Sequence, residues 1–110
     1  MKLRILSCVW LVLVGAARAQ NPDNGKRLYL KNGCFECHGY AGQGGAARTR
    51  LSGTKMTAEA FQTFVRNPPP GDMPPYKSKV MTNEELADVW AYVRTFPASR
   101  SWKDIPLLRF

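Results

Sequence analysis

The sequence predicts an all-α domain with three main helices. Helix signals occur in three segments, residues 23–32, 57–66 and 82–96. No segment shows the alternation of apolar and polar residues that is typical of a half-buried strand. The stretches between the helices are rich in glycine or proline, which favour turns and loops. We therefore expect helices joined by irregular loops, without internal repeats.

The first expected helix spans residues 23–32. Pro22 precedes it, Asp23 is a suitable N-cap, and Gly33 supplies a stop signal. The chain before Cys34 is therefore expected to be helical rather than extended.

The second expected helix spans residues 57–66 and must end before Pro68, because proline cannot continue a helix and restricts the residue before it. Four of its apolar side chains share one face. These are Ala60, Phe61, Phe64 and Val65.

The third expected helix is the most clearly marked. Thr82 and Glu85 form a capping box at its start. Apolar residues then recur at helical spacing as far as Pro97. They are Leu86, Val89, Trp90, Val93 and Phe96.

The pentapeptide Cys34–His38 spells C-x-x-C-H, the signature of covalent haem attachment. Two thiols three positions apart lie on one helical turn, where both can reach the vinyl groups at one edge of a haem. The adjacent His38 then supplies the proximal nitrogen ligand to the iron. We therefore expect one covalent haem c, with thioether bonds from Cys34 and Cys37.

Three other interpretations of the cysteine pair are weaker. A zinc site needs four ligands, and the chain beyond residue 19 offers only Cys34, Cys37 and His38. A thioredoxin-like dithiol normally follows a strand in a βαβ setting, which the expected first helix does not provide. A disulfide between cysteines on one turn closes a trivial loop and stabilises little.

Residues 1–19 are predicted to form a cleaved secretory signal peptide. A short positive region precedes an apolar run at residues 5–14, and Ala17–Ala19 is a small-x-small cleavage site. The apolar run is too short to span a bilayer comfortably. Cleavage would leave one domain of 91 residues, 20–110, with no membrane span. Export to the bacterial periplasm agrees with the haem motif, because haem is attached outside the cytoplasmic membrane.

The expected mature domain is moderately basic. The full chain has 16 Lys and Arg against 8 Asp and Glu, and loss of the three basic residues in the signal leaves 13 against 8, a net charge of +5. The basic residues are scattered, which argues against nucleic-acid binding. We expect this charge to steer the domain toward acidic redox partners. A merely solvated basic surface is the alternative.

Met73 is the expected sixth ligand. The chain has no second histidine, so a thioether is the available axial partner for iron. Met73 lies within residues 68–75, a segment with five prolines that restrict its backbone. Met56 and Met81 precede helices, where core packing is the ordinary role. Ligation by one of these two methionines, or an open site, stays an alternative.

Residues 20–97 resemble a small class I cytochrome c of the bacterial periplasmic kind. The resemblance rests on Cys34–His38, on Met73–Pro74, and on a C-terminal amphipathic helix with Trp90–Val93. It implies the all-α cytochrome c fold, with terminal helices that cross over one haem. We also expect residues 68–75 and the five-glycine segment 39–53 to line the haem.

The resemblance further implies that Gly25 and Tyr29 on the first helix meet Tyr92 on the last. One position departs from the family pattern. Many members have a proline whose carbonyl accepts a hydrogen bond from the proximal histidine, and Thr49 stands there, followed by the expected Leu51. Another backbone carbonyl is then expected to accept that bond.

Arg48 and Arg50 are candidates to pair with a haem propionate, with solvated side chains as the alternative. Residues 98–110 form an apolar C-terminal tail beyond the region of resemblance. We expect this tail to fold back over its own domain. Docking to a partner protein is the alternative.

The expected function is one-electron transfer in the periplasm, between a donor dehydrogenase or membrane complex and an acceptor oxidase or reductase. Such a protein is a carrier and not an enzyme. A dedicated haem subunit of a periplasmic oxidoreductase would have the same motifs, and the apolar tail favours it mildly. A haem sensor or small peroxidase would need a polar distal residue, and no distal histidine is available.

Overall fold

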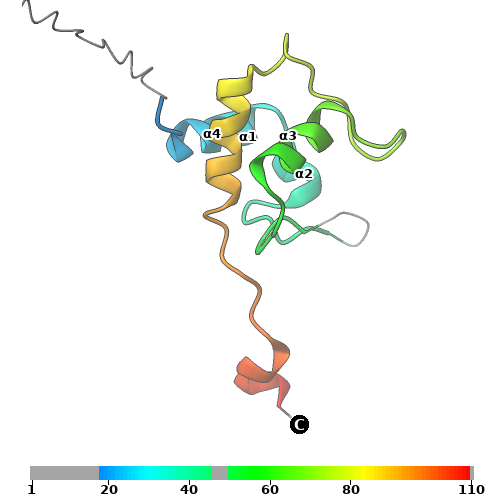
Figure 1. The fold of residues 1–110 in the computed structure, drawn as a ribbon. Helices are drawn as coiled ribbons and strands as arrows, with labels where there is room; N and C mark the ends of the chain where they lie inside the picture. Colours follow the sequence, from blue (N-terminus) through cyan, green and yellow to red (C-terminus); the bar gives the residue numbers. More distant parts are fainter. Residues whose placement is uncertain (1–17, 46–49, 110) are drawn as a thin grey trace, which may run out of the picture.

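The computed structural model describes residues 18–45 and 50–109. Within them the chain forms four α-helices followed by two short 3₁₀ helices, and no strand (Figure 1). The helices are α1 (Pro22–Lys31), α2 (Cys34–His38), α3 (Ala58–Arg66) and α4 (Asn83–Val93). The all-α expectation is confirmed, with one more helix than the three expected.

Helix α1 begins earlier than predicted. Asn21, not Asp23, is the N-cap, and its side-chain oxygen accepts hydrogen bonds from the backbone N–H groups of Asp23 and Asn24. Pro22 occupies the first helical position, where its missing N–H costs nothing. Asp23 instead lies in the first turn, where its negative charge suits the helix dipole.

Helices α3 and α4 have the predicted boundaries at their starts. The Thr57 hydroxyl caps α3, which ends at Arg66 ahead of the prolines. The capping box of Thr82 and Glu85 is formed in both directions. Regular α4 ends at Val93, earlier than the apolar pattern suggested, and a hydrogen-bonded turn follows it.

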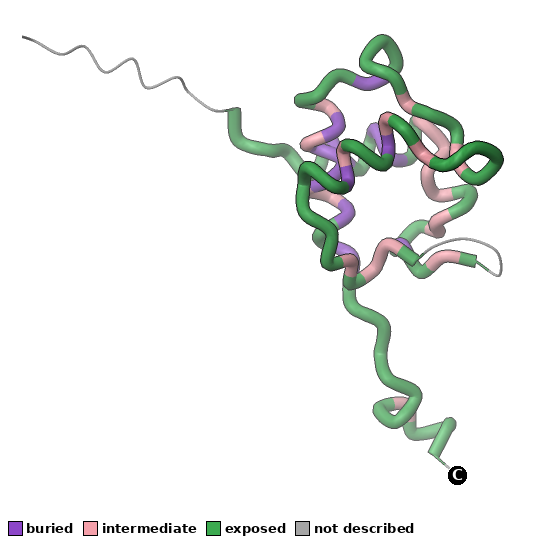
Figure 2. The backbone as a smooth tube through the Cα atoms, turned by 45° about the vertical axis from the view of Figure 1, so that its right-hand side comes forward, coloured by how far each residue is buried: buried purple, intermediate pink, exposed green. Residues whose placement is uncertain are grey.

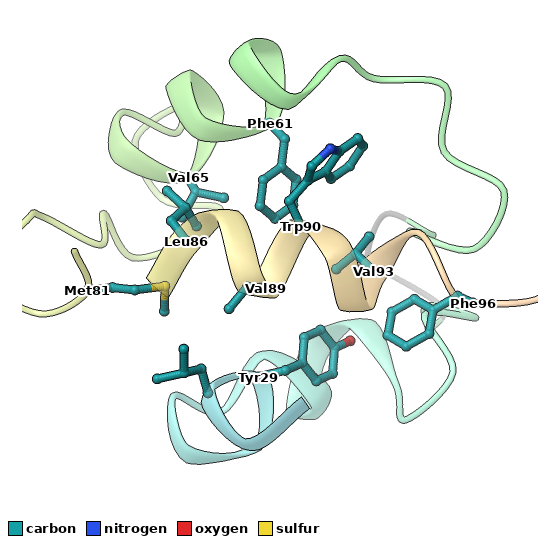
Figure 3. Close-up of a cluster of buried hydrophobic side chains, with 10 residues drawn as sticks. Tyr29, Phe61, Val65, Met81, Leu86, Val89, Trp90, Val93 and Phe96 are labelled. Atoms are coloured by element: carbon teal, nitrogen blue, oxygen red, sulfur yellow. The ribbon is translucent and has the colours of Figure 1, made fainter. Parts of the chain in front are cut away.

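The core lies on both sides of α4 (Figure 3). Phe61 and Val65 of α3 pack on one side of this helix, and Tyr29 of α1 packs on the other. The ten buried apolar residues are Leu28, Tyr29, Phe61, Val65, Met81, Leu86, Val89, Trp90, Val93 and Phe96.

Helices α1 and α4 approach closely at Gly25. A Cβ atom at this position would overlap the backbone carbonyl of Asp88 and contact the Cβ of Tyr92. Four residues further along α1, the ring of Tyr29 packs edge-on against Tyr92, with ring centroids 5.5 Å apart. The expected meeting of Gly25 and Tyr29 with Tyr92 is therefore confirmed.

Asp88 joins the same two helices by hydrogen bonds. Its buried carboxylate accepts from the Asn21 backbone N–H at 2.8 Å, from Asn24 Nδ2 at 2.8 Å and from Arg18 Nη2 at 3.1 Å. Burial raises the pKa of Asp88, but these donors outweigh it and hold the pKa below its ordinary value. The Asn21 and Asn24 bonds do not depend on Arg18, which the predicted signal cleavage would remove.

The C-terminal tail extends away from the helical domain (Figures 1 and 2). Its 3₁₀ helices, Trp102–Asp104 and Pro106–Leu108, contact each other and no other helix. Every described residue after Phe96 is exposed except Ile105, which is partly buried. The expectation that the tail folds back over its own domain is wrong. Buried positions are confined to the helical domain and none lies in the tail, whose two 3₁₀ helices pack only on each other (Figure 2).

Replacing Asp88 should make the free energy of unfolding less dependent on pH in the acidic range. We expect Asp88→Asn to lower the free energy of unfolding by about 1–3 kcal/mol at neutral pH, because a buried charge-assisted network is lost. A depressed pKa stabilises the fold above the unfolded value of about 4 and loses that contribution as the pH falls through the folded pKa. Urea unfolding at neutral pH and at about pH 3 measures both effects. An equal difference between variant and wild type at the two pH values would contradict this role.

Candidate functional site

A cavity of about 350 Å³ lies beside α4, between α2, α3 and the loop that joins α3 to α4. Four residues predicted from the sequence line it together: Cys34, Cys37, His38 and Met73. His38 and Met73 are 35 positions apart in the chain. The fold thus gathers the predicted haem-attachment and iron-ligand residues around one cavity.

Helix α2 consists of the C-x-x-C-H segment alone. Gly33 precedes it with a φ of 72°, and Gly39 ends it with a φ of 81°. Both values are in the left-handed region, which glycine adopts without a steric penalty. These glycines separate α2 from α1 and from the following loop, so Cys34 and Cys37 lie on a short helical turn of their own.

Tyr29 fastens the end of α2 to the core. Its hydroxyl donates to the Gly39 carbonyl at 2.7 Å. Burial raises the pKa of Tyr29 above its ordinary value, so the hydroxyl stays protonated and continues to donate. The same tyrosine therefore packs α1 against α4 and positions the turn that follows His38.

The surroundings of the Cys34 thiol disfavour its thiolate form. Burial raises the pKa of Cys34 to about 11, so the sulfur is protonated at neutral pH. Reactive dithiols of the thioredoxin kind instead have a lowered pKa. The thioredoxin-like interpretation of this pair therefore gains no support from the environment of Cys34.

The cavity wall is largely apolar and is shared with the core. Phe64 and Met56 line it while 43% and 38% exposed, so the cavity reaches the surface at these residues. Seven of the ten buried core residues face it, which means that the core borders the cavity rather than closing over it. They are Tyr29, Phe61, Val65, Met81, Leu86, Val89 and Val93.

The two irregular stretches contribute unequally. From the glycine-rich segment only Leu51, among its described residues, lines the cavity. The segment between α3 and α4, which we call the methionine loop (residues 67–82), contributes Asp72, Met73 and Pro74 as well as residues nearer α4. The methionine loop is therefore the main irregular wall of the cavity.

Tyr76 attaches the methionine loop to the ends of two helices, a role that the sequence did not predict. Its backbone N–H donates to the Val65 carbonyl at 3.1 Å, and its hydroxyl donates to the Asn32 carbonyl at 2.9 Å. Burial raises the pKa of Tyr76, which keeps the hydroxyl protonated. The sequence offered one sign of this role, because Tyr76 follows the predicted ligand Met73 by only three positions.

All three described methionines line the cavity, but their environments differ. Met81 is 2% exposed and belongs to the core, as expected. Met56 is 38% exposed and is not a core residue. Met73 is partly buried and packs against the core from the methionine loop. Ligation by Met73 stays a prediction, and Met56 provides a natural comparison.

Arg50, one of the two arginines predicted to contact propionates, does not lie at the cavity. The Arg50 side chain is exposed, donates to the Gln43 carbonyl at 3.4 Å, and is not among the lining residues. Arg48 and Thr49 lie outside the described residues, as does nearly all of the predicted signal peptide. The carbonyl that accepts a bond from His38 stays a prediction.

The residues around the cavity fit a haem. The donor set offers two thiols for thioether bonds, an imidazole and a thioether, which are the side chains that attach and ligate haem iron in c-type sites. The apolar wall suits a porphyrin face. Among residues 18–45 and 50–109, no three His, Cys, Asp or Glu side chains cluster as they would around a bare metal ion.

Comparison with known proteins gives one family. A model of the family described as "Cytochrome C oxidase, cbb3-type, subunit III" matches residues 20–93. No curated protein and no solved structure matches the chain significantly. None of the helices in the described part of the chain is long and apolar enough to cross a membrane. The matched range begins at the predicted cleavage site and contains every residue predicted to attach or ligate the haem.

Proposed function

The chain belongs to the family described as cytochrome C oxidase, cbb3-type, subunit III, and from this premise we propose that it carries single electrons between partner proteins. As a c-type cytochrome it has the all-α cytochrome c fold and a covalently attached haem c, and its activity is haem-based electron transfer.

One observation carries the proposed ligation. The thiols of the C-x-x-C-H helix, His38 and Met73 all line the same cavity, although the methionine is remote in sequence. We assign Cys34 and Cys37 to the thioether bonds, His38 to the proximal position and Met73 to the distal position. This set leaves no open iron position, which suits a carrier rather than an enzyme.

The haem, when bound, supplies a one-electron ferric–ferrous couple whose potential a thioether ligand raises. The protein's part is to keep the ligands in place in both oxidation states, so that little rearranges during transfer. The Tyr29 and Tyr76 hydroxyls fasten the turn after His38 and the loop bearing Met73. The largely apolar cavity wall makes the site unfavourable for water.

The proposed partners are acidic redox proteins in the bacterial periplasm: a donor dehydrogenase or membrane complex, and an acceptor oxidase or reductase. The net positive charge supports this choice, since it steers the domain toward acidic surfaces. Such steering weakens as salt screens the charges.

The first test addresses covalent attachment. Cys34→Ser and Cys37→Ser should each leave the haem held by a single thioether, because each thiol adds to one vinyl group. The double variant should lose all haem under denaturing extraction, as measured by mass spectrometry of the intact chain. Cys8→Ser controls only for export, because the predicted cleavage removes residue 8, and it should retain full attachment. Intact covalent haem in the double variant would contradict the assignment.

The second test addresses the distal ligand. Met73→Leu should abolish the thioether-to-iron charge-transfer band of the oxidised protein and allow the reduced protein to bind carbon monoxide. Met56→Leu, at the same cavity, should do neither. Both swaps conserve volume, so repacking alone should cost less than about 1.5 kcal/mol of stability. Loss of the band in the Met56 variant alone would show that the distal assignment is wrong.

A dedicated electron-transfer subunit is the second candidate function, and the C-terminal tail favours it. Trp102 and Leu107 are 59% and 91% exposed and contact no helix of the domain. Large apolar side chains displayed in this way often mark a protein-binding surface. In this role the tail would attach the domain to a larger catalytic chain.

Removing the tail separates the two candidates. Deletion of residues 99–110 should leave the free energy of unfolding unchanged within about 0.5 kcal/mol, because the 3₁₀ helices of the tail contact no other helix and its described residues, Ile105 aside, are exposed. For a subunit, the deletion should abolish co-purification with a larger chain in fixed stoichiometry. A freely exchanging carrier should transfer electrons equally well with and without the tail, which stopped-flow mixing with a redox partner measures.

A further inference from the structure

Arg66, the last residue of α3, uses its guanidinium to bind the methionine loop. Its Nη1 donates to the carbonyls of Tyr76 at 2.8 Å and Met81 at 2.7 Å, and its Nη2 donates to Asn83 Oδ1 at 2.8 Å. Within the described residues its guanidinium pairs with no carboxylate, the one ion pair there being Arg18 with Asp88. One side chain thus binds the second half of the methionine loop at two carbonyls and the start of α4 at a third acceptor.

A second cation also joins the end of α3 to the methionine loop, with the donor in the loop and the acceptors at the end of the helix. Lys77, in the methionine loop, donates from Nζ to the Arg66 carbonyl at 2.9 Å and to Asn67 Oδ1 at 3.0 Å. The end of α3 and the second half of the methionine loop therefore exchange charge-assisted hydrogen bonds both ways. Such bonds are stronger than those between neutral groups.

The connection from Tyr76 to Met73 is short and stiff. Only Pro74 and Pro75 separate the two residues, and each proline ring fixes its own φ near −65°. Tyr76 is bound by Arg66 at its carbonyl, by Val65 at its N–H and by Asn32 at its hydroxyl. Because Pro74 and Pro75 restrict the backbone between Met73 and Tyr76, fixing Tyr76 also limits where Met73 can lie.

We propose that Arg66 is a positioning residue for Met73: its guanidinium fixes the Tyr76 and Met81 carbonyls and thereby keeps the Met73 thioether at the cavity. This inference rests on the proposed function, in which Met73 is the distal ligand. Arg66 itself does not line the cavity.

A cation at the C-terminus of α3 also stabilises the helix dipole, which is a purely structural role. Lysine would serve that role as well as arginine. Lysine would not reproduce the planar guanidinium, whose two terminal nitrogens reach different acceptors. The single lysine nitrogen is a compact point charge without this fork. The comparison of Arg66→Lys with Arg66→Gln therefore separates positioning from simple charge.

The test uses the haem-loaded protein and three variants: Arg66→Lys, Arg66→Gln and, as control, Arg94→Gln. Arg94 is an exposed arginine at the end of α4, and its side chain has no hydrogen bond to the described residues of the methionine loop. We expect Arg66→Gln to lose most of the charge-transfer band and to bind carbon monoxide about tenfold more readily in the reduced state. Arg66→Lys should be intermediate, and Arg94→Gln should match wild type.

Hydrogen exchange gives a readout independent of the iron. Amides of residues 76–81 should exchange about tenfold faster in Arg66→Gln, while those of α1 should keep their wild-type protection. An unchanged band, carbon monoxide response and exchange rate in both Arg66 variants would overturn the inference. If Arg66→Gln does not fold, Arg66→Lys decides: a reduced band with full haem attachment supports positioning, and an unchanged band overturns it.

The Met73→Leu variant keeps the two proposals distinct. If it retains the charge-transfer band, the distal assignment fails and the inference falls with it. If it loses the band while both Arg66 variants keep theirs, the assignment stands and only the positioning role of Arg66 is wrong.

Discussion

The close approach of α1 and α4 at Gly25 is the constraint on which the rest of the structure depends. The missing side chain lets the backbone of α1 lie against the Asp88 carbonyl, a distance that no other residue type would permit without displacement. The carboxylate of the same Asp88 then accepts bonds from the start of α1. One residue of α4 therefore meets α1 through its backbone and fixes it through its side chain.

This crossing places Tyr29 where its ring and its hydroxyl serve different purposes. The ring packs edge-on against Tyr92 and Phe96, each at 5.5 Å between centroids. The hydroxyl reaches the Gly39 carbonyl and fixes the end of α2. The helix crossing is thereby connected, through one side chain, to the segment that carries the two thiols and His38.

The apolar core of the domain is not closed by protein side chains alone, because it borders the cavity. Most of its buried apolar residues also face the cavity, so the core and the cofactor site share one apolar surface. In so short a chain a large apolar cofactor would supply much of the missing interior. The exposed tail contributes nothing to this core, which is why its Trp102 and Leu107 remain available to another molecule.

The sequence alone determined the all-α class, the capped start of α4, the proline end of α3 and the cysteine–histidine motif, because each depends on residues within a few positions of one another. It also predicted the meeting of Gly25 with Tyr92 through family resemblance. The sequence also predicted that Met73 lies with His38 at one site. Only the tertiary structure decided which core residues line the cavity, that Asp88 joins two helices, that Arg66 and Tyr76 bind the methionine loop, and that the tail extends away from the domain. These outcomes depend on hydrogen bonds and packing between segments far apart in the chain, and local sequence patterns carry no record of such distances.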